Sequence, residues 1–186
     1  DLAHDDHDYY WQNDPLHVAD MASFKRKGGS WAVDHQNVYY IGWEAKIGKY
    51  KMPIGDYRTF RVLNDFYAAD AKYVYYKNKV VEGADPKTFV VLDGENDYGQ
   101  DKNRVYYQDC GTTIRNLDAL KHRKMGNGMY ETFHTDGKTV YNPTLMPMPV
   151  GTDYKTLHRV ERYRDWYADK NRVYYENRLL PDAKGI

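Results

Sequence analysis

The sequence predicts an all-β protein made of tandem antiparallel β-hairpin or meander repeats of about 33 residues. Three observations lead to this prediction: a repeated phrase, its regular spacing, and the strand-forming residues around it. The phrase is an aspartate, a short polar turn, and then a valine followed by one or two tyrosines. It occurs in two near-identical copies and three weaker ones: Asp101–Tyr107 and Asp169–Tyr175, then Asp34–Tyr40, Asp70–Tyr76 and Asp136–Asn142.

The spacing of these phrases indicates stacked repeats. The aspartates at 34, 70, 101, 136 and 169 lie 36, 31, 35 and 33 residues apart, and a tyrosine follows each of them by five residues. Such a period is typical of units that bury one another's apolar faces. We expect one repeat-built domain over 1–186, with units near 9–38, 39–74, 75–105, 106–140 and 141–173 and a terminal hairpin at 174–186.

Two further features recur in each unit. One is an aspartate followed three residues later by a small residue and then by a bulky apolar one, at Asp20–Phe24, Asp56–Phe60, Asp85–Phe89 and Asp153–Leu157, with a degenerate copy at Asn116–Leu120. The other is a lone aromatic shortly before the turn aspartate, at Trp31, Tyr67, Tyr98, Phe133 and Tyr167.

The residue types around these anchors favour strands and tight turns. Valine and tyrosine runs bounded by Asp, Asn, Gly and Pro are typical of strands. We expect hairpins after Tyr76 and Tyr175, and short helical turns at 117–121 and 155–162. Adjacent strand residues point to opposite faces, so the two tyrosines of a pair should pack against different neighbouring units.

The overall arrangement could be an open, curved array or a small propeller-like ring. Units of this length hold three strands easily, whereas propeller blades usually have four. Both ends of the chain also carry the same element, at Tyr9-Tyr10 and Val173–Tyr175, which disfavours ring closure by strand exchange. We therefore expect an open array.

The repeated phrases, together with the segment Val80–Leu92, resemble the bacterial DKNYY repeat family. The likeness extends from about Trp31 to Tyr175 and departs from the family phrase at Ala71-Lys72, Gly137-Lys138 and Asn142. It implies a bacterial repeat protein, often exported or associated with the cell envelope. It implies no activity and no catalytic residue.

Composition narrows the possible partners. The chain has 27 basic and 27 acidic residues, so a general attraction to nucleic acid or anionic lipid is not indicated. No run of about 18 apolar residues exists that would span a membrane. A single cysteine, Cys110, excludes an internal disulfide. Because the chain opens at Asp1 rather than Met, we expect that processing has removed a preceding segment. The periplasmic or envelope-associated location that we expect is what the resemblance to the DKNYY family implies.

Candidate chemistry is sparse. His4–Asp8 contains metal-ligand types, but a chain end supplies no fixed geometry, so we interpret it as a solvated terminus. The turn aspartates offer too few oxygens for calcium and are better explained as turn formers. No catalytic motif is present, and we predict neither an enzyme nor a cofactor, although a carboxylate-based hydrolase remains a third alternative.

Two binding hypotheses follow. In the first, aromatic side chains recognise another protein, as in an immunity or adaptor protein that masks a bacterial effector. In the second, exposed aromatics stack against glycans. For each tryptophan, the alternative to a binding role is burial between units. The candidate binding residues are Trp11, Trp43, Trp166, Tyr40, Tyr76, Tyr107 and Tyr175.

Overall fold

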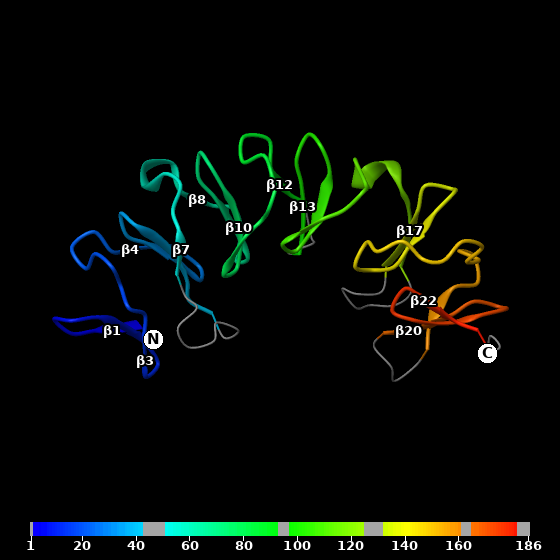
Figure 1. Cartoon of the computed structure of the whole chain (residues 1–186), viewed down its shortest axis with the longest axis horizontal. Helices are drawn as coiled ribbons and strands as arrows, with labels where there is room; N and C mark the ends of the chain where they lie inside the picture. The colour runs from blue at the N-terminus through cyan, green and yellow to red at the C-terminus, as the bar shows by residue number, and fades with distance from the viewer. Residues whose placement is uncertain (1, 43–50, 93–96, 125–131, 161–164, 182–186) are drawn as a thin grey trace. The chain divides into compact units, whose positions relative to one another are not determined.

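The computed structural model describes residues 2–42, 51–92, 97–124, 132–160 and 165–181. In these residues the regular elements are β-strands, apart from two short 3-10 turns, η1 (Tyr57–Thr59) and η2 (Leu117–Ala119). The strands form six small antiparallel sheets (Figure 1). The prediction of an all-β, repeat-built fold is therefore confirmed.

Each sheet is an open meander whose strands pair in chain order. Sheet A contains β1 (Leu2–His4), β2 (Tyr9–Trp11) and β3 (Asp14–Pro15). Sheet B contains β4 (Lys25–Gly28), β5 (Trp31–Val33), β6 (Asn37–Tyr40) and β7 (Lys51–Pro53). Sheet C contains β8 (Arg61–Val62), β9 (Tyr67–Ala69), β10 (Val74–Tyr76) and β11 (Lys79–Val80).

The remaining sheets follow the same plan. Sheet D contains β12 (Val90–Val91), β13 (Tyr98–Gln100), β14 (Val105–Tyr107) and β15 (Cys110–Gly111). Sheet E contains β16 (Lys121–Lys124), β17 (Thr132–Thr135) and β18 (Val140–Tyr141). Sheet F contains β19 (His158–Arg159), β20 (Trp166–Ala168), β21 (Val173–Tyr175) and β22 (Arg178–Leu180).

The chain forms two compact units, residues 1–115 with sheets A to D and residues 116–186 with sheets E and F. The repeat boundaries predicted after residues 38, 74, 105, 140 and 173 fall inside β6, β10, β14, β18 and β21. The sheet is the repeating structural element, because the turn that begins at the aspartate joins two neighbouring strands of one sheet. The helical turn expected at 117–121 is η2, whereas the one expected at 155–162 is wrong, because β19 occupies 158–159.

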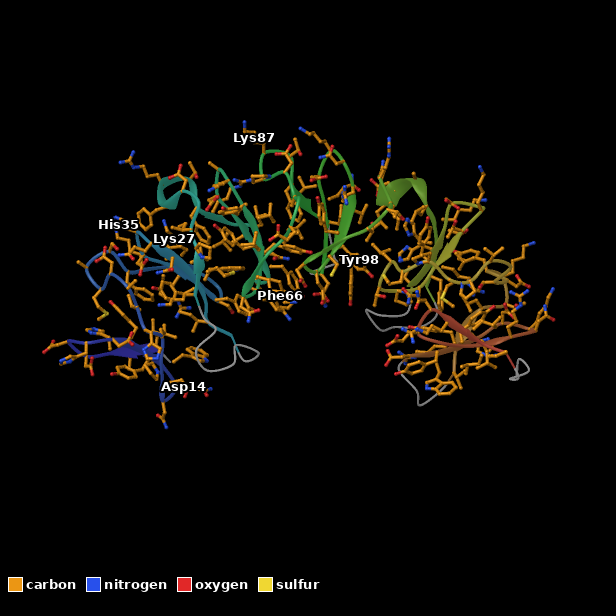
Figure 2. All side chains as sticks on the ribbon, viewed as in Figure 1. Asp14, Lys27, His35, Phe66, Lys87 and Tyr98 are labelled. Atoms are coloured by element: carbon orange, nitrogen blue, oxygen red, sulfur yellow. The ribbon has the colours of Figure 1, made fainter. Side chains whose placement is uncertain are left out.

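Successive sheets within a unit share apolar cores. Between sheets B and C, the rings of Trp31 and Tyr40 pack with Phe60 and Tyr75. Equivalent clusters join sheets A and B, sheets C and D, and sheets E and F. Figure 2 shows side chains crowded between the sheets of residues 1–115, while Lys87, at the tip of a turn, points outward.

The tyrosine pairs of sheets B and C each serve two cores at once, as the strand geometry predicts, whereas Tyr107 of sheet D is half-buried and Tyr175 of sheet F is exposed. Tyr75 packs toward sheet B, whereas its neighbour Tyr76 packs toward Phe89 and Tyr106 of sheet D. Both tyrosines of this pair are buried. Alternation along a strand therefore lets one short phrase link three consecutive sheets.

Sheet F corrects one sequence assignment. The lone aromatic there is Trp166, not Tyr167, since Trp166 pairs with Tyr175 in the register that Trp31 has with Tyr40. Tyr167 instead lies opposite Tyr174, a position held by Ala32, Ala68 and Gly99 in sheets B to D. In the other four units the lone aromatic lies three residues before the turn aspartate, a spacing that selects Trp166 here, but the sequence assignment took the adjacent Tyr167.

A buried aspartate organises each well-formed repeat. In sheet C, Asp70 is fully buried, and its Oδ1 accepts the backbone N–H groups of Lys72 and Tyr73. Its Oδ2 accepts the Tyr75 hydroxyl at 2.6 Å and the N–H groups of Gly55 and Asp56. One carboxylate thus fixes its own turn, the tyrosine five residues on, and the loop that enters the sheet. We call this arrangement the aspartate clamp.

The clamp recurs with the same atoms in three other sheets. The tyrosine hydroxyl lies 2.5 Å from Oδ2 in sheet B, 3.0 Å in sheet D and 2.7 Å in sheet F. The clamp pairs are Asp34 with Tyr39, Asp101 with Tyr106, and Asp169 with Tyr174. The prediction that these aspartates form turns is confirmed, and their oxygens accept N–H and O–H donors.

The second recurring phrase completes the clamp. The hydroxyl of Thr88 accepts the N–H of Lys102, the residue that follows the clamp aspartate of sheet D. Ser23, Thr59 and Thr156 do the same in sheets B, C and F. The Asp-x-x-Ser/Thr spacing is therefore explained by a hydrogen bond to the next turn along the chain.

The N-terminal segment is a sixth copy of the repeat. Its residues His4–His7 are exposed, as expected of a solvated terminus, but the hydrogen bonds of Asp5 give it a defined turn that the prediction did not include. β1 pairs with β2, and Asp5 between them accepts the N–H groups of His7 and Asp8. The Tyr10 hydroxyl, five residues after Asp5, donates to Asp5 Oδ2 at 3.0 Å. The spacing of five was the available signal, but the absence of a Val-Tyr-Tyr phrase concealed it.

Sheet E has lost most of the clamp. Asp136 is exposed and accepts only the N–H groups of Lys138 and Thr139. Ala119 stands where other units have Ser or Thr, so the hydroxyl that would receive the next turn is missing. This divergence makes sheet E a natural internal control.

We predict that Asp101→Ala lowers the free energy of unfolding by about 3 kcal/mol, because four donors lose a buried acceptor. The matched change Asp136→Ala should cost no more than about 1 kcal/mol, since its two donors can turn to water. Urea denaturation followed by far-UV circular dichroism measures both. Equal losses would show that the buried hydrogen bonds do not distinguish the two turns.

We also predict acid sensitivity from the clamps. Burial opposes ionisation of Asp70, Asp101 and Asp169, but their hydrogen bonds outweigh it and hold each pKa below the usual value. A lowered folded-state pKa gives stability that is present above the unfolded value of about 3.9 and is lost as pH falls through the folded one. Chemical denaturation from pH 5 to pH 2 should show this loss, and Asp101→Asn should reduce its slope. An unchanged slope would contradict the assignment.

Candidate binding groove

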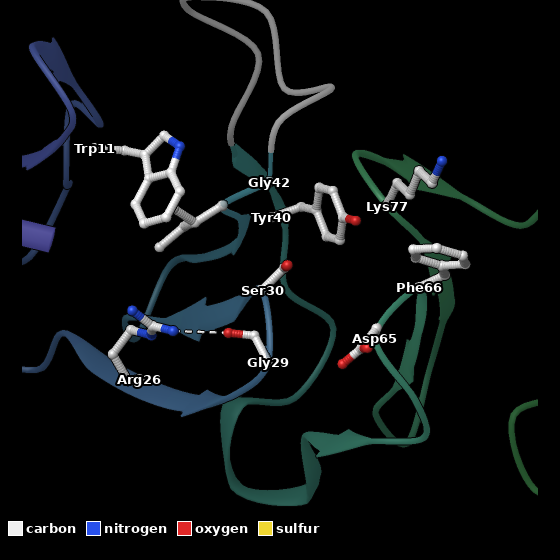
Figure 3. Close-up of a pocket in the computed structure, with 10 residues that line it drawn as sticks. Trp11, Arg26, Gly29, Ser30, Tyr40, Gly42, Asp65, Phe66 and Lys77 are labelled. Atoms are coloured by element: carbon white, nitrogen blue, oxygen red, sulfur yellow. Dashed lines mark hydrogen bonds between the residues drawn. The ribbon is translucent and has the colours of Figure 1, made fainter. Parts of the chain in front are cut away.

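The first unit carries a groove lined by three of its sheets (Figure 3). Trp11 comes from β2 of sheet A, Tyr40 from β6 of sheet B, and Phe66 from the loop before β9 of sheet C. Its volume is about 360 Å³, within the usual range of small-ligand and side-chain pockets. The described residues that line it are Trp11, Arg26, Gly29, Ser30, Tyr40, Ile41, Gly42, Asp65, Phe66 and Lys77.

Local backbone geometry explains the groove's position. Gly29 adopts a left-handed conformation at φ 50°, and a β-carbon there would lie 2.8 Å from Asp65 Oδ1. A residue with a side chain would therefore push Asp65 away. Glycine allows sheet B and the Asp65 loop of sheet C to approach closely enough to form one continuous wall.

Charged groups surround the aromatic rings. Arg26 donates from Nη2 to the Gly29 carbonyl at 2.7 Å, which fixes its guanidinium at the groove wall. Lys77 Nζ lies 4.7 Å from the centre of the Phe66 ring and 5.4 Å from that of Tyr76. A cation on a ring face is attracted to its π electrons. The groove thus offers apolar rings, two cations and one carboxylate, a mixture suited to a peptide segment.

The structure places the predicted binding residues in different surroundings. Trp11 and Tyr40 both line the groove, although Tyr40 is only 4% exposed and most of its ring packs between sheets B and C. Tyr76 is 4% exposed, and its hydroxyl donates to the Asp97 carboxylate, so it acts within the core. Tyr107 is half-buried beside Tyr98. Trp43 lies outside the described residues.

Trp166 and Tyr175 form a separate aromatic surface on sheet F. Their rings meet edge to face at 5.5 Å, and 36% and 40% of these residues are exposed. The corresponding pair in sheet B, Trp31 and Tyr40, is buried by sheet C. The sequence analysis gave burial between units as the alternative role of each tryptophan. Among the described tryptophans, this alternative is confirmed for Trp31 alone.

Four groove residues escaped sequence reasoning: Arg26, Asp65, Phe66 and Lys77. Arg26 lies on β4, Asp65 and Phe66 lie in the loop before β9, and Lys77 lies in the turn after β10. None of them belongs to a repeated phrase, and the stacking of sheets B and C places them together. The basic stretch Lys25–Lys27 contained Arg26 and offered the one available signal.

A pair of histidines in sheet E was also missed. His122 and His134 lie on adjacent strands with their Nδ1 atoms 2.7 Å apart. His134 is buried, and its Nε2 has no hydrogen-bond partner among the residues that the structure describes. Burial, together with the neighbouring His122, lowers the pKa of His134 to about 4.

The structure offers little to a metal or cofactor. In the described part of the chain, no three His, Cys, Asp or Glu side chains are grouped so as to hold a metal ion. Cys110 lies exposed on β15. Within the same residues, no helix has the length and apolar character needed to cross a membrane.

A family comparison agrees with the repeat structure. The model of the DKNYY family matches residues 47–110, a stretch that contains β7, sheet C, β12–β14 and two complete clamps. Over this segment the chain is similar to the DKNYY family. The DKNYY segment contributes Asp65, Phe66 and Lys77 to the groove. Comparison with curated proteins finds no match, and comparison with solved structures finds none either.

We predict that the histidine pair makes stability depend on pH above the range of the clamps. A folded-state pKa near 4, below the unfolded value of about 6.5, means that the unfolded chain binds the proton more readily. Stability should be complete above about pH 6.5 and fall toward pH 4. Sheets B and C have alanine at the position of His134. His134→Ala should therefore make the free energy of unfolding less dependent on pH between about 6.5 and 4, whereas His35→Ala should leave that dependence unchanged. A slope that survives in His134→Ala would contradict the prediction.

Proposed function

We propose that this chain is a non-catalytic protein-interaction module and that the aromatic groove is its binding surface. The observation that carries the proposal is the convergence of Trp11, Tyr40 and Phe66 from three sheets on one groove. Aromatic residues and arginine are enriched among the side chains that dominate protein interfaces. The proposed partner is a segment of another protein that inserts an apolar side chain between these rings.

The groove's chemistry favours recognition over turnover. Asp65 is the one carboxylate among the ten described residues of the lining, and these ten include no histidine or cysteine. Glycoside hydrolysis generally needs two carboxyl groups, and nucleophilic catalysis needs a nucleophile beside a base. The lining therefore supports binding and gives a carboxylate-based hydrolase no acid and base pair at this site.

The biological setting belongs to the same proposal. A module that occupies a partner's apolar segment could mask an effector protein, as an immunity or adaptor protein of the bacterial envelope does. The net charge of zero supports a partner that is recognised by shape and local contacts rather than by overall attraction.

A second candidate is glycan binding on sheet F. The exposed rings of Trp166 and Tyr175 present about the area on which a sugar ring can stack. This candidate uses a different sheet in the other compact unit, so the same set of variants can separate the two functions.

The deciding experiment is a native pull-down with the immobilised chain, followed by mass spectrometry and a binding titration of the captured protein. We expect Lys77→Glu and Trp11→Ala each to weaken binding by about tenfold or more, as loss of an interface anchor does. The matched controls Lys87→Glu, on an exposed turn, and Trp166→Ala, on sheet F, should bind like the wild type.

Other outcomes would redirect the proposal. If both groove variants keep full affinity, the groove is not the binding surface. Retention on a glycan array that Trp166→Ala abolishes would favour the second candidate. Turnover on a hydrolase panel, lost on changing one carboxylate, would overturn a non-catalytic role.

A further inference from the structure

A second pocket lies on sheet D, on the turn after Asp101 and the residues that follow β15. It is lined by Lys102, Asn103, Arg104, Thr112, Thr113 and Arg115, and its volume is about 540 Å³. Three of these six residues are cationic, three carry a hydroxyl or amide group, and none of them is acidic. In a chain with balanced charge, this is a local concentration of positive charge and hydrogen-bond donors.

The residue three positions after the clamp aspartate distinguishes this pocket from its counterparts. In sheet B, Asn37 donates to the Tyr39 hydroxyl at 3.4 Å. In sheet C, Tyr73 packs edge to face against Tyr75. In both sheets the side chain at this position is therefore engaged by its own repeat.

Sheets D and F make the closest comparison, because both carry the phrase Asp-Lys-Asn-Arg-Val-Tyr-Tyr. In sheet F, Arg172 Nη1 donates to the Val150 carbonyl at 2.9 Å. Within the described residues, the guanidinium groups of Arg104 and Arg115 in sheet D make no hydrogen bond or ion pair to protein. The same local sequence thus places Arg172 in a hydrogen bond to the backbone, whereas Arg104 is available to bind a ligand.

Gly111 provides the space that the Arg104 side chain crosses. A β-carbon at Gly111 would lie 3.1 Å from Arg104 Cδ and 3.4 Å from its Nη1. The Arg104 side chain therefore lies against β15, and it lines the pocket together with Thr113 and Arg115. Lys102 contributes less charge, because it pairs with Asp85 at 3.0 Å.

We propose that this pocket binds a tetrahedral oxyanion, the phosphate or sulfate ester group of a ligand. Guanidinium groups present paired N–H donors that match such oxyanions, and a nearby hydroxyl and amide can donate to the remaining oxygens. The site is independent of the aromatic groove, so failure of either proposal leaves the other standing.

The test is a titration of the full chain with inorganic phosphate and, separately, with inorganic sulfate, at constant ionic strength set with sodium chloride. Backbone amide shifts in ¹H–¹⁵N NMR spectra report binding at Asn103 and Thr113. We expect saturable shifts in the wild type and affinity about tenfold weaker in Arg104→Ala and in Arg115→Ala. Arg172→Ala, the same change in the duplicate phrase, should bind like the wild type. A thermal melt confirms that each variant is folded.

Several results would overturn the proposal: no saturable shift with either anion, shifts that chloride reproduces, or equal affinity in the wild type and both sheet D variants. A preference for phosphate would identify a phosphate ester as the ligand group, and a preference for sulfate would identify a sulfate ester.

Discussion

The buried aspartate carboxylate is the interaction on which the rest of this structure depends. A carboxylate removed from water must receive hydrogen bonds to remain ionised, and each clamp supplies them from its own turn, a tyrosine and the incoming loop. In sheet C these donors are Lys72, Tyr73, Tyr75, Gly55 and Asp56. Since those groups come from separate parts of the repeat, one side chain sets the position of the loop relative to the strands.

The clamp also explains why so polar a sequence folds. Tyrosine provides a large ring for the core between sheets, while its hydroxyl satisfies the aspartate beneath it. Burial and the Asp70 carboxylate both raise the pKa of Tyr75, which keeps the hydroxyl protonated as a donor. The repeats use tyrosine where phenylalanine could fill the same space. Each tyrosine therefore adds a hydrogen-bond donor to a core that is otherwise apolar.

The proposed binding surfaces lie at positions that take no part in the aspartate clamp. Positions inside the clamp are fully occupied, so variation accumulates in turns such as Asp65-Phe66 and in the residue three after the aspartate. In sheet B that residue bonds Tyr39, and in sheet F it bonds the Val150 carbonyl, whereas Arg104 of sheet D lines an open pocket. A conserved scaffold can thus carry a different surface on each sheet.

The all-β class, the repeat spacing and the turn role of the aspartates could be predicted from the sequence, because each follows from residues close together in the chain. The repeat at Asp5 and the position of Trp166 also follow spacings of five and three residues that the sequence carries, although they were overlooked. The commitment of Tyr76 to the core required the tertiary structure. The tertiary structure also placed Trp11, Tyr40 and Phe66 around one groove. Strand register and the stacking of separate sheets bring these residues together, and contacts between distant segments leave no periodic signal in the chain.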